Sequence, residues 1–325
     1  MKYQGDQLKS FSKQIDFVLA NYHAHGLSVS SFRNVIIGGL GGSGIGGRIA
    51  KMYFQDTLPI PCEVVSDYTL PAYVGADTLV IASSYSGNTE ESLSLFDDAK
   101  KRGAKIICIS TGGKLKEKAL ASNVPFYAAE PGFQPRMALG YSLPTLLLIF
   151  SELLGIELKS GISNLSKNLS NTEIYLNRAM DFFSTYSNTL NRKYVIVADK
   201  NTEPVALRLC QQIQENAKEE AFLHVIPEMN HNVIESYYGV RESNFIFIYT
   251  HQNPRVKARF EFMAELFKSS GYTFSSFVIP EWNMQSMFET IYVLDWLSLI
   301  LADAKGVNSV QIPNINALKG YLDKL

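Results

Sequence analysis

The chain has 325 residues, of which 46% are hydrophobic and 19% are charged, and its formal net charge at pH 7 is −1. A chain of this length can bury more than one core, so we expect two globular domains. The near-zero net charge argues against a nucleic-acid partner or an acidic membrane surface, because both would require a strongly basic face.

The first 21 residues have the pattern of a charged amphipathic helix, which differs from a signal or transit peptide. The longest apolar run elsewhere, residues 143–150, is too short to cross a bilayer. The three cysteines, Cys62, Cys108 and Cys210, are far apart and odd in number. They are typical of reduced core residues and not of a disulfide framework or a metal site. These features predict a cytoplasmic protein.

A glycine-rich run, VIIGGLGGSGIGGRI, occupies residues 35–49. We interpret it as a buried strand at residues 35–37, a tight loop, and a helix over residues 48–54. Such a turn suits an anion, because the free N–H groups at the start of the helix would face the ligand. Gly42 would contribute an amide and Ser43 a hydroxyl.

The same run allows two other interpretations. Gly39, Gly41 and Gly44 fit the dinucleotide pattern G-x-G-x-x-G, and Glu63 stands about where a ribose-binding acid would follow. A glycine-rich turn that binds no ligand is also possible. A nucleotide P-loop is not, because no Lys-Ser/Thr pair closes the run.

Short apolar strands alternate with helical stretches over residues 35–154. This alternation predicts an α/β fold with a doubly wound, mainly parallel sheet that has helices on both faces. Ligands of such sheets bind at the carboxyl ends of the strands. The expected strands are residues 35–37, 62–65, 78–82, 105–109 and 125–128, and the expected helices are residues 48–54, 90–102, 115–121 and 137–154.

The third expected strand leads into the sequence SSYSGNTEES, residues 83–92. Neutral hydroxyls next to a helix N-terminus suit the phosphate of a small molecule held without a metal, and we select Ser84, Ser86 and Thr89 for that role. A helix cap with spare serines explains this loop alone equally well. Two such loops at the ends of strands in one sheet favour a phosphorylated sugar over a dinucleotide, because a dinucleotide fold does not need the second loop.

The glycine run and the hydroxyl loop together resemble the sugar isomerase (SIS) domain, whose Ser/Thr loop grips the phosphate of a phosphosugar. Three further segments resemble the bifunctional phosphoglucose/phosphomannose isomerases of that superfamily: PGFQPRMALGYS at residues 131–142, QENAKEEAF at 214–222 and PEMNHNVIE at 227–235. The resemblance implies two SIS-like doubly wound domains in a homodimer. It also implies that the enzyme interconverts glucose 6-phosphate and fructose 6-phosphate, with mannose 6-phosphate as a further substrate, and that it needs no metal or cofactor.

A stretch rich in Ser, Asn, Gly and Lys, residues 155–172, suggests a linker. We therefore expect a phosphate-binding N-terminal SIS domain at residues 1–157 and a catalytic C-terminal SIS domain at residues 158–325. The second half repeats the order of the first but lacks both the glycine and the hydroxyl loops, so we expect it to supply catalytic side chains to a shared cleft. Its expected strands are residues 194–198 and 245–249, and its expected helices are residues 174–190, 205–218, 254–269, 291–301 and 314–325.

Four residues of the second set of motifs are candidates for catalysis. From their spacing alone, Glu215, His231 and Lys319 would be ordinary surface residues. Arg136 differs, because it stands at a helix start, where its charge is unfavourable without an anionic partner. The resemblance implies that Glu215 carries a proton between two sugar carbons, which a buried carboxylate of raised pKa can do. It implies that Arg136 stabilises the enediolate, that His231 and Lys319 open the sugar ring, and that His231 comes from the neighbouring subunit at an interface active site.

One position departs from the resembling isomerases. Enzymes of this group that accept both epimers at C2 have a threonine about two helical turns before the lysine, and here Ile312 and Gln311 stand in that place. Turnover of mannose 6-phosphate is therefore less strongly implied than turnover of glucose 6-phosphate.

Two other classes of protein compete with the isomerase. A regulator that binds a sugar phosphate without converting it would keep the hydroxyl loop but would not need Glu215, His231 and Arg136 together. A transcriptional version would also be expected to carry a helix-turn-helix segment, which the sequence lacks. A dinucleotide-dependent oxidoreductase would bind a nicotinamide cofactor through the glycine run.

Overall fold

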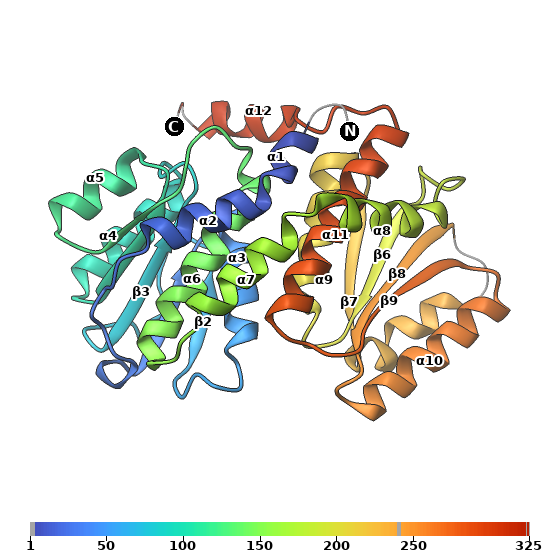
Figure 1. Ribbon diagram of the computed structural model, residues 1–325, viewed down its shortest axis with the longest axis horizontal. Coiled ribbons are helices and arrows are strands. Elements are labelled where there is room, and N and C mark those ends of the chain that lie inside the picture. The colour runs from blue at the N-terminus through green and yellow to red at the C-terminus, as the bar shows by residue number, and fades with distance from the viewer. Residues whose placement is uncertain (1–3, 239–241, 323, 325) are drawn as a thin grey trace. The chain divides into compact units, whose positions relative to one another are not determined.

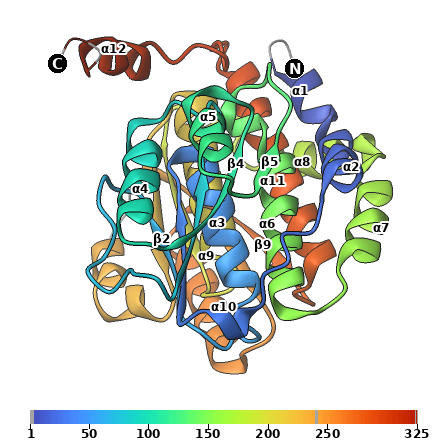
Figure 2. The same cartoon turned by 90° about the vertical axis from the view of Figure 1, so that its left-hand side faces the viewer.

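The computed structural model describes residues 4–238, 242–322 and 324. The chain forms two compact units, one spanning Lys9–Asn171 and the other joining residues 4–8 to the chain from Thr172 onward. Each unit is a parallel sheet with helices on both faces (Figures 1 and 2), which confirms the expected α/β class.

The N-terminal unit contains a five-stranded parallel sheet in the order β2-β1-β3-β4-β5. The chain passes from β1 to β2 on one side and then to β3 on the other side, so the topological switch point lies between β1 and β3. The elements are α2 (Phe11–Asn21), η1 (Val29–Ser31), β1 (Asn34–Gly38), α3 (Gly41–Tyr53), β2 (Cys62–Val65), β3 (Thr78–Ser83), α4 (Glu90–Lys101), β4 (Lys105–Ser110), α5 (Gly113–Ala121), β5 (Phe126–Ala128), η2 (Pro135–Met137), α6 (Leu139–Leu154) and α7 (Lys159–Leu169).

Helix α3 begins at Gly41, inside the glycine run and not after it as the sequence suggested. The reason is close packing: a Cβ on Gly47 would lie 2.8 Å from Cγ2 of Ile37, and a Cβ on Gly42 would lie 2.7 Å from the carbonyl oxygen of Pro135. The glycines therefore let the helix approach strand β1 and the η2 turn, at the cost of their low helix propensity.

Helix α7 lies within the stretch that the sequence suggested to be a linker. Its buried side chains include Ile162 and Leu165, and the hydroxyl of Ser166 donates to Oδ1 of Asp16 on α2 at 2.6 Å. Since α7 packs on α2, the two units divide after Asn171, whereas the composition of the sequence placed the boundary near residue 157.

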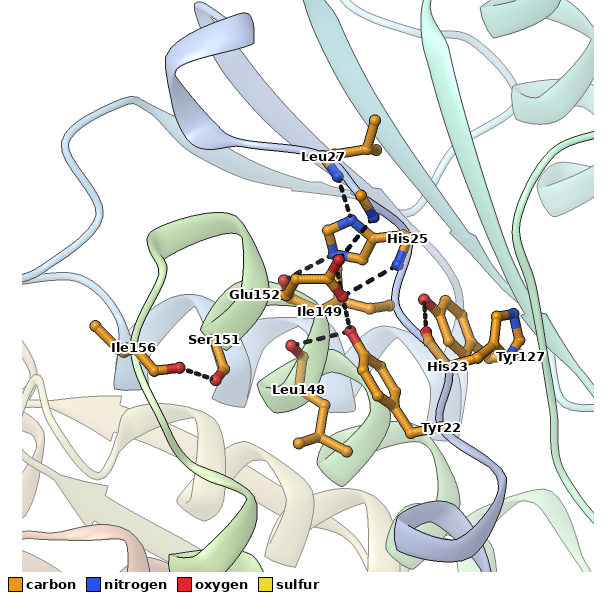
Figure 3. Close-up of polar contacts among 11 residues, drawn as sticks. Tyr22, His23, His25, Leu27, Tyr127, Leu148, Ile149, Ser151, Glu152 and Ile156 are labelled. Atoms are coloured by element: carbon orange, nitrogen blue, oxygen red, sulfur yellow. Dashed lines mark hydrogen bonds and ion pairs between the residues drawn. The ribbon is translucent and has the colours of Figure 1, made fainter.

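The connection between α2 and β1 is fixed by one carboxylate at the end of α6 (Figure 3). Glu152 accepts hydrogen bonds from the main-chain N–H groups of Gly26 at 2.7 Å and His25 at 3.1 Å and from the Tyr22 hydroxyl at 2.7 Å. Burial alone would raise the pKa of Glu152, but these donors outweigh it and hold that pKa below its ordinary value. The ionised carboxylate thus ties an irregular segment to the core.

The C-terminal unit contains a four-stranded parallel sheet in the order β7-β6-β8-β9, which repeats the order β2-β1-β3-β4. The repeat expected between the two halves is therefore present. The elements are α1 (Gly5–Lys9), α8 (Thr172–Ser184), β6 (Lys193–Ala198), α9 (Glu203–Gln212), η3 (Ile213–Ala217), β7 (Ala221–Val225), η4 (Glu228–His231), η5 (Val233–Tyr237), β8 (Ser243–Thr250), α10 (Pro254–Ser269), β9 (Thr273–Ile279), α11 (Met284–Ala304) and α12 (Pro313–Leu322).

Strands β7 and β9 were not expected from the sequence. Both are edge strands whose side chains are mostly half-buried or exposed, so neither has the continuous apolar run that marks the central strands. Among the described residues, no helix is both long enough and apolar enough to span a membrane.

The cysteines form no disulfide. Cys108 and Cys210 are buried, and burial raises the pKa of each thiol to about 12. Such thiols stay protonated and unreactive at neutral pH.

Candidate functional site

The two loops selected from the sequence lie at the switch point of the N-terminal sheet, at the carboxyl ends of β1 and β3. The main-chain N–H of Tyr85, in the loop after β3, donates to Oγ of Ser43 in the first turn of α3 at 3.1 Å. Open α/β sheets bind their ligands at this point. A small pocket lies here, and its lining includes Gly42, Ser43, Ser83, Tyr85, Ser110 and Ser142.

The hydroxyl loop brings two of its selected side chains into contact. Ser84 is almost fully buried, and its Oγ lies 2.8 Å from Oγ1 of Thr89 and accepts the N–H of Gly87 at 3.2 Å. Thr89 is the N-cap of α4, yet its side chain does not cap the helix. Ser86 is exposed, and its Oγ accepts the N–H of Asn88 at 3.2 Å. The interpretation that the Thr89 side chain serves only to cap helix α4 is therefore wrong.

The shape of the hydroxyl loop depends on a glycine. Gly87 has φ +71°, and a Cβ there would lie 1.9 Å from the carbonyl oxygen of Gly112 in the loop after β4. The two loops are also joined by main-chain hydrogen bonds of 2.9 Å from Thr111 to Tyr85 and from Leu115 to Gly87. Only glycine fits at position 87, because any side chain would push the loops apart.

Arg136 lies next to this site in the same unit. It is 4% exposed, and its Nη1 lies 3.4 Å from Oε1 of Gln134. It belongs to η2, which packs on the start of α3, where Pro135 fills the space above Gly42. A buried guanidinium can neutralise negative charge on a ligand that reaches it.

Glu215 lies in the C-terminal unit on a π-helical segment. Helix α9 widens at Ile213 into η3, which ends at Lys218 in the left-handed conformation with φ 55°. The ammonium of Lys218 donates to the carbonyl of Glu215 and, at 2.6 Å, to that of Gln311. Glu215 is half-buried. Such π-turns are frequent at functional sites, because the extra residue redirects a side chain.

A buried polar network holds this π-turn against α11. Arg208 donates to both carboxylate oxygens of Asp295, at 2.9 and 2.6 Å, and Gln212 donates to Oδ1 at 2.9 Å. Asn216, the neighbour of Glu215, donates to Oγ of Ser298 at 2.9 Å, and that hydroxyl donates to the carbonyl of Asp295 at 2.7 Å. Burial raises the pKa of Asp295, and Arg208 opposes this effect.

Sequence reasoning missed this network, although a signal was present. Arg208, Gln212 and Asn216 recur every four residues, a spacing that places polar side chains on one face of a helix. Their partners on α11 lie in an otherwise apolar stretch, where Asp295 is the unusual residue.

His231 is exposed at the end of η4. The side-chain amides on either side of it bond to other residues: Oδ1 of Asn230 accepts from Arg259 at 3.3 Å, and Nδ2 of Asn232 donates to Glu228 at 3.0 Å. The neighbouring amides therefore do not select the tautomer of His231 in the single chain.

Lys319 is exposed on α12, a helix without buried side chains. The departure at position 312 lies just before this helix: Ile312 is half-buried, and the preceding carbonyl of Gln311 is held by Lys218. The segment before α12 is thereby attached to the residue that ends the π-turn of Glu215.

The selected residues fall into two groups. In the N-terminal unit Gly42 and Ser43 line the small pocket, and Ser84 and Thr89 contact each other in the hydroxyl loop. Ser86 is exposed in the same loop, and Arg136 follows Pro135, which packs against Gly42. The C-terminal unit carries Glu215, His231 and Lys319 on η3, η4 and α12.

The dinucleotide interpretation of the glycine run depends on Glu63. Glu63, the expected ribose ligand, accepts a hydrogen bond from the hydroxyl of Tyr73. Within residues 4–238, 242–322 and 324, no three His, Cys, Asp or Glu side chains are grouped as a metal site.

The repeated parallel sheets and the hydroxyl-lined switch point define a protein built from SIS domains. The SIS domain model matches residues 28–128, and the model of the bacterial phospho-glucose isomerase C-terminal SIS domain matches residues 173–322. The chain belongs to the family of the bifunctional phosphoglucose/phosphomannose isomerases. It is 37% identical to the bifunctional phosphoglucose/phosphomannose isomerase of Caldicellulosiruptor bescii over 90% of each chain.

A second relative agrees with this family assignment, and a solved structure agrees with the fold. The chain is 32% identical to the bifunctional phosphoglucose/phosphomannose isomerase of Aquifex aeolicus, over 91% of this chain and 92% of the relative. Among solved structures, the C-terminal domain of glucosamine-fructose-6-phosphate aminotransferase from Francisella tularensis superimposes with a TM-score of 0.71 at 15% identity, covering 95% of this chain and 98% of that one. The last comparison shows the fold alone. Family membership makes the chain an isomerase and confirms the family that its motifs resemble.

Proposed function

We propose that the chain interconverts glucose 6-phosphate, mannose 6-phosphate and fructose 6-phosphate as an aldose–ketose isomerase. The observation that carries this proposal is the contact between the hydroxyls of Ser84 and Thr89 at the switch point, in a chain that also presents Glu215 on a rigidly held π-turn. The names of the curated relatives support both aldose substrates.

The phosphate is bound by the N-terminal unit in this proposal. Ser43, Ser84, Ser86 and Thr89 donate hydroxyl hydrogen bonds, and the amide of Gly42 adds a main-chain donor. The N-termini of α3 and α4 favour the negative charge, because their first N–H groups lack partners within the helix.

The chemistry then needs a proton to move between neighbouring carbons. His231 and Lys319 open the ring by moving a proton between the ring oxygen and the C1 hydroxyl. Glu215 removes the proton at C2, the freed electron pair forms the C1–C2 double bond of a cis-enediolate, and the C1 carbonyl pair moves onto O1. The O2 proton passes to O1, and as the C2 carbonyl forms Glu215 returns its proton to C1 to give the ketose. Arg136 stabilises the negative oxygen of the enediolate, a role that a metal would otherwise fill.

The proposal includes the assembly and the location of the enzyme. His231 acts in the site of the neighbouring subunit of a homodimer, which agrees with its exposure on a single chain. We place this dimer in the cytoplasm, where phosphorylated sugars are made and used.

The decisive experiment is a coupled isomerase assay with fructose 6-phosphate and a chelator, comparing the native chain with Glu215→Gln. We expect the variant to lose about 10²–10⁴-fold in kcat, because the amide cannot accept the proton. Glu220→Gln is the matched control, since Glu220 is exposed and pairs with Lys193 at the surface. Undiminished turnover by Glu215→Gln would refute the proton shuttle, and loss of native activity in chelator would refute the metal-free scheme.

The same assay separates the competing functions. A regulator would bind fructose 6-phosphate in calorimetry without turning it over. An oxidoreductase would enhance the fluorescence of NADH on binding.

A further inference from the structure

The switch point of the C-terminal sheet is closed by a buried carboxylate. Strands β6 and β8 flank this point, as β1 and β3 do in the N-terminal sheet. Asp199 is the first residue after β6, and Thr250 is the last residue of β8. They are 4% and 2% exposed, so both belong to the interior of this unit.

Each oxygen of the Asp199 carboxylate meets a main-chain amide and a hydroxyl. Oδ2 accepts the N–H and the hydroxyl of Thr250, both at 2.7 Å. Oδ1 accepts the N–H of Thr202 at 2.8 Å and lies 2.9 Å from the Thr202 hydroxyl. Thr202 is the N-cap of α9, so the negative charge lies at the positive end of a helix. This donor set is of the kind that binds a phosphate oxygen.

The N-terminal sheet differs at the corresponding place. The first residue after β1 is Gly39, and a Cβ there would lie 2.9 Å from the carbonyl oxygen of Ser83. No side chain can therefore enter the N-terminal switch point from the end of β1. The hydroxyls of Ser84 and Thr89 contact each other there and not a carboxylate.

We propose that Asp199 is a built-in anion that occupies the C-terminal unit's counterpart of the phosphate site, so that each chain holds one sugar phosphate and not two. The inference rests on the proposed function, because it takes the N-terminal switch point to be a phosphate site. A phosphate in the C-terminal switch point would meet both the bulk and the negative charge of Asp199. The carboxylate also joins β6, β8 and the start of α9, the helix that leads to Glu215.

Removal of the carboxylate should leave a hole that small anions can fill. We expect Asp199→Ala to lower the unfolding temperature of the C-terminal unit by about 5 °C or more. Sodium formate should restore at least half of that loss, whereas sodium chloride at equal ionic strength should not. The native chain should show no difference between the two salts. Both tryptophans of the chain, Trp282 and Trp296, lie in this unit, so their fluorescence reports its unfolding.

Two further variants complete the test. Asp199→Asn keeps the shape without the charge; it should be destabilised and not restored by formate, because its amide fills the hole. Asp181→Ala removes an exposed aspartate of α8 and should unfold as the native chain does.

The inference is overturned if formate fails to restore folded Asp199→Ala, or if Asp199→Asn is as stable as the native chain. If Asp199→Ala does not fold in either salt, the inference is tested with Asp199→Asn alone, and it is overturned if that variant is as stable as the native chain. Turnover of fructose 6-phosphate by the native chain is measured in parallel. If turnover is absent while formate restores Asp199→Ala, the proposed isomerase function is refuted, whereas the assignment of Asp199 as a built-in anion is retained.

Discussion

The buried pair between Arg208 and Asp295 allows a prediction with a worked magnitude. These residues are 3% and 1% exposed, so Asp295→Ala leaves a buried guanidinium without its carboxylate. Breaking such a pair from one side costs about 3–5 kcal/mol. The amide of Gln212 also loses an acceptor, which places the expected loss at the upper end of that range.

The loss of stability can be followed specifically in the C-terminal unit of the full chain. Urea unfolding followed by tryptophan fluorescence reports on Trp282 and Trp296, both of which lie in this unit. The matched control is the double variant Arg208→Met with Asp295→Leu, because a buried pair replaced by apolar residues of similar size costs little or stabilises. We expect the double variant to be more stable than Asp295→Ala, although one charge more has been removed.

Catalysis supplies a second readout for the same variants. Asn216 and Ser298 connect Asp295 to the π-turn, so a shift of this network moves the Glu215 side chain. The double variant should therefore regain stability while its kcat for fructose 6-phosphate stays low. Asp295→Ala within about 1 kcal/mol of the native free energy of unfolding would refute the reasoning, as would a double variant less stable than Asp295→Ala.

Three further outcomes follow from single contacts. Gly87→Ala should lower the melting temperature and raise the KM for fructose 6-phosphate, because its Cβ would lie 1.9 Å from Gly112; Gly103→Ala, which has a similar φ of +75° but open space, should lose less stability and keep its KM. Glu152→Gln should be less stable than the native chain at neutral pH in calorimetry. A carboxyl of lowered pKa stabilises above its unfolded pKa, so this difference should shrink as the pH falls below the ordinary glutamate pKa of about 4.3 and vanish once the pH is below the lowered pKa of folded Glu152; a constant difference would contradict the assignment. Ser84→Ala should raise the KM about tenfold or more, with kcat less affected, in steady-state assays.

The sequence alone determined the central strands and the loops that follow them. Buried parallel strands must be continuous apolar runs, so β1, β3 and β4 could be read directly. The order of strands and helices placed the loops after β1 and β3 at one edge of a sheet. Motifs around Glu215 and His231 then carried the family assignment.

Tertiary structure decided what depends on contacts between distant residues. Helix α3 can begin at Gly41 only because Ile37 and Pro135 require close approach, and local propensity reads those glycines as a loop. Edge strands β7 and β9 follow from pairing with β6 and β8 and not from their own burial. The carboxylates of Asp199 and Asp295 each depend on donors far along the chain, Thr250 for Asp199 and Arg208 for Asp295. Periodicity records which face of an element is apolar, whereas it carries no information on which distant donor a buried charge will meet.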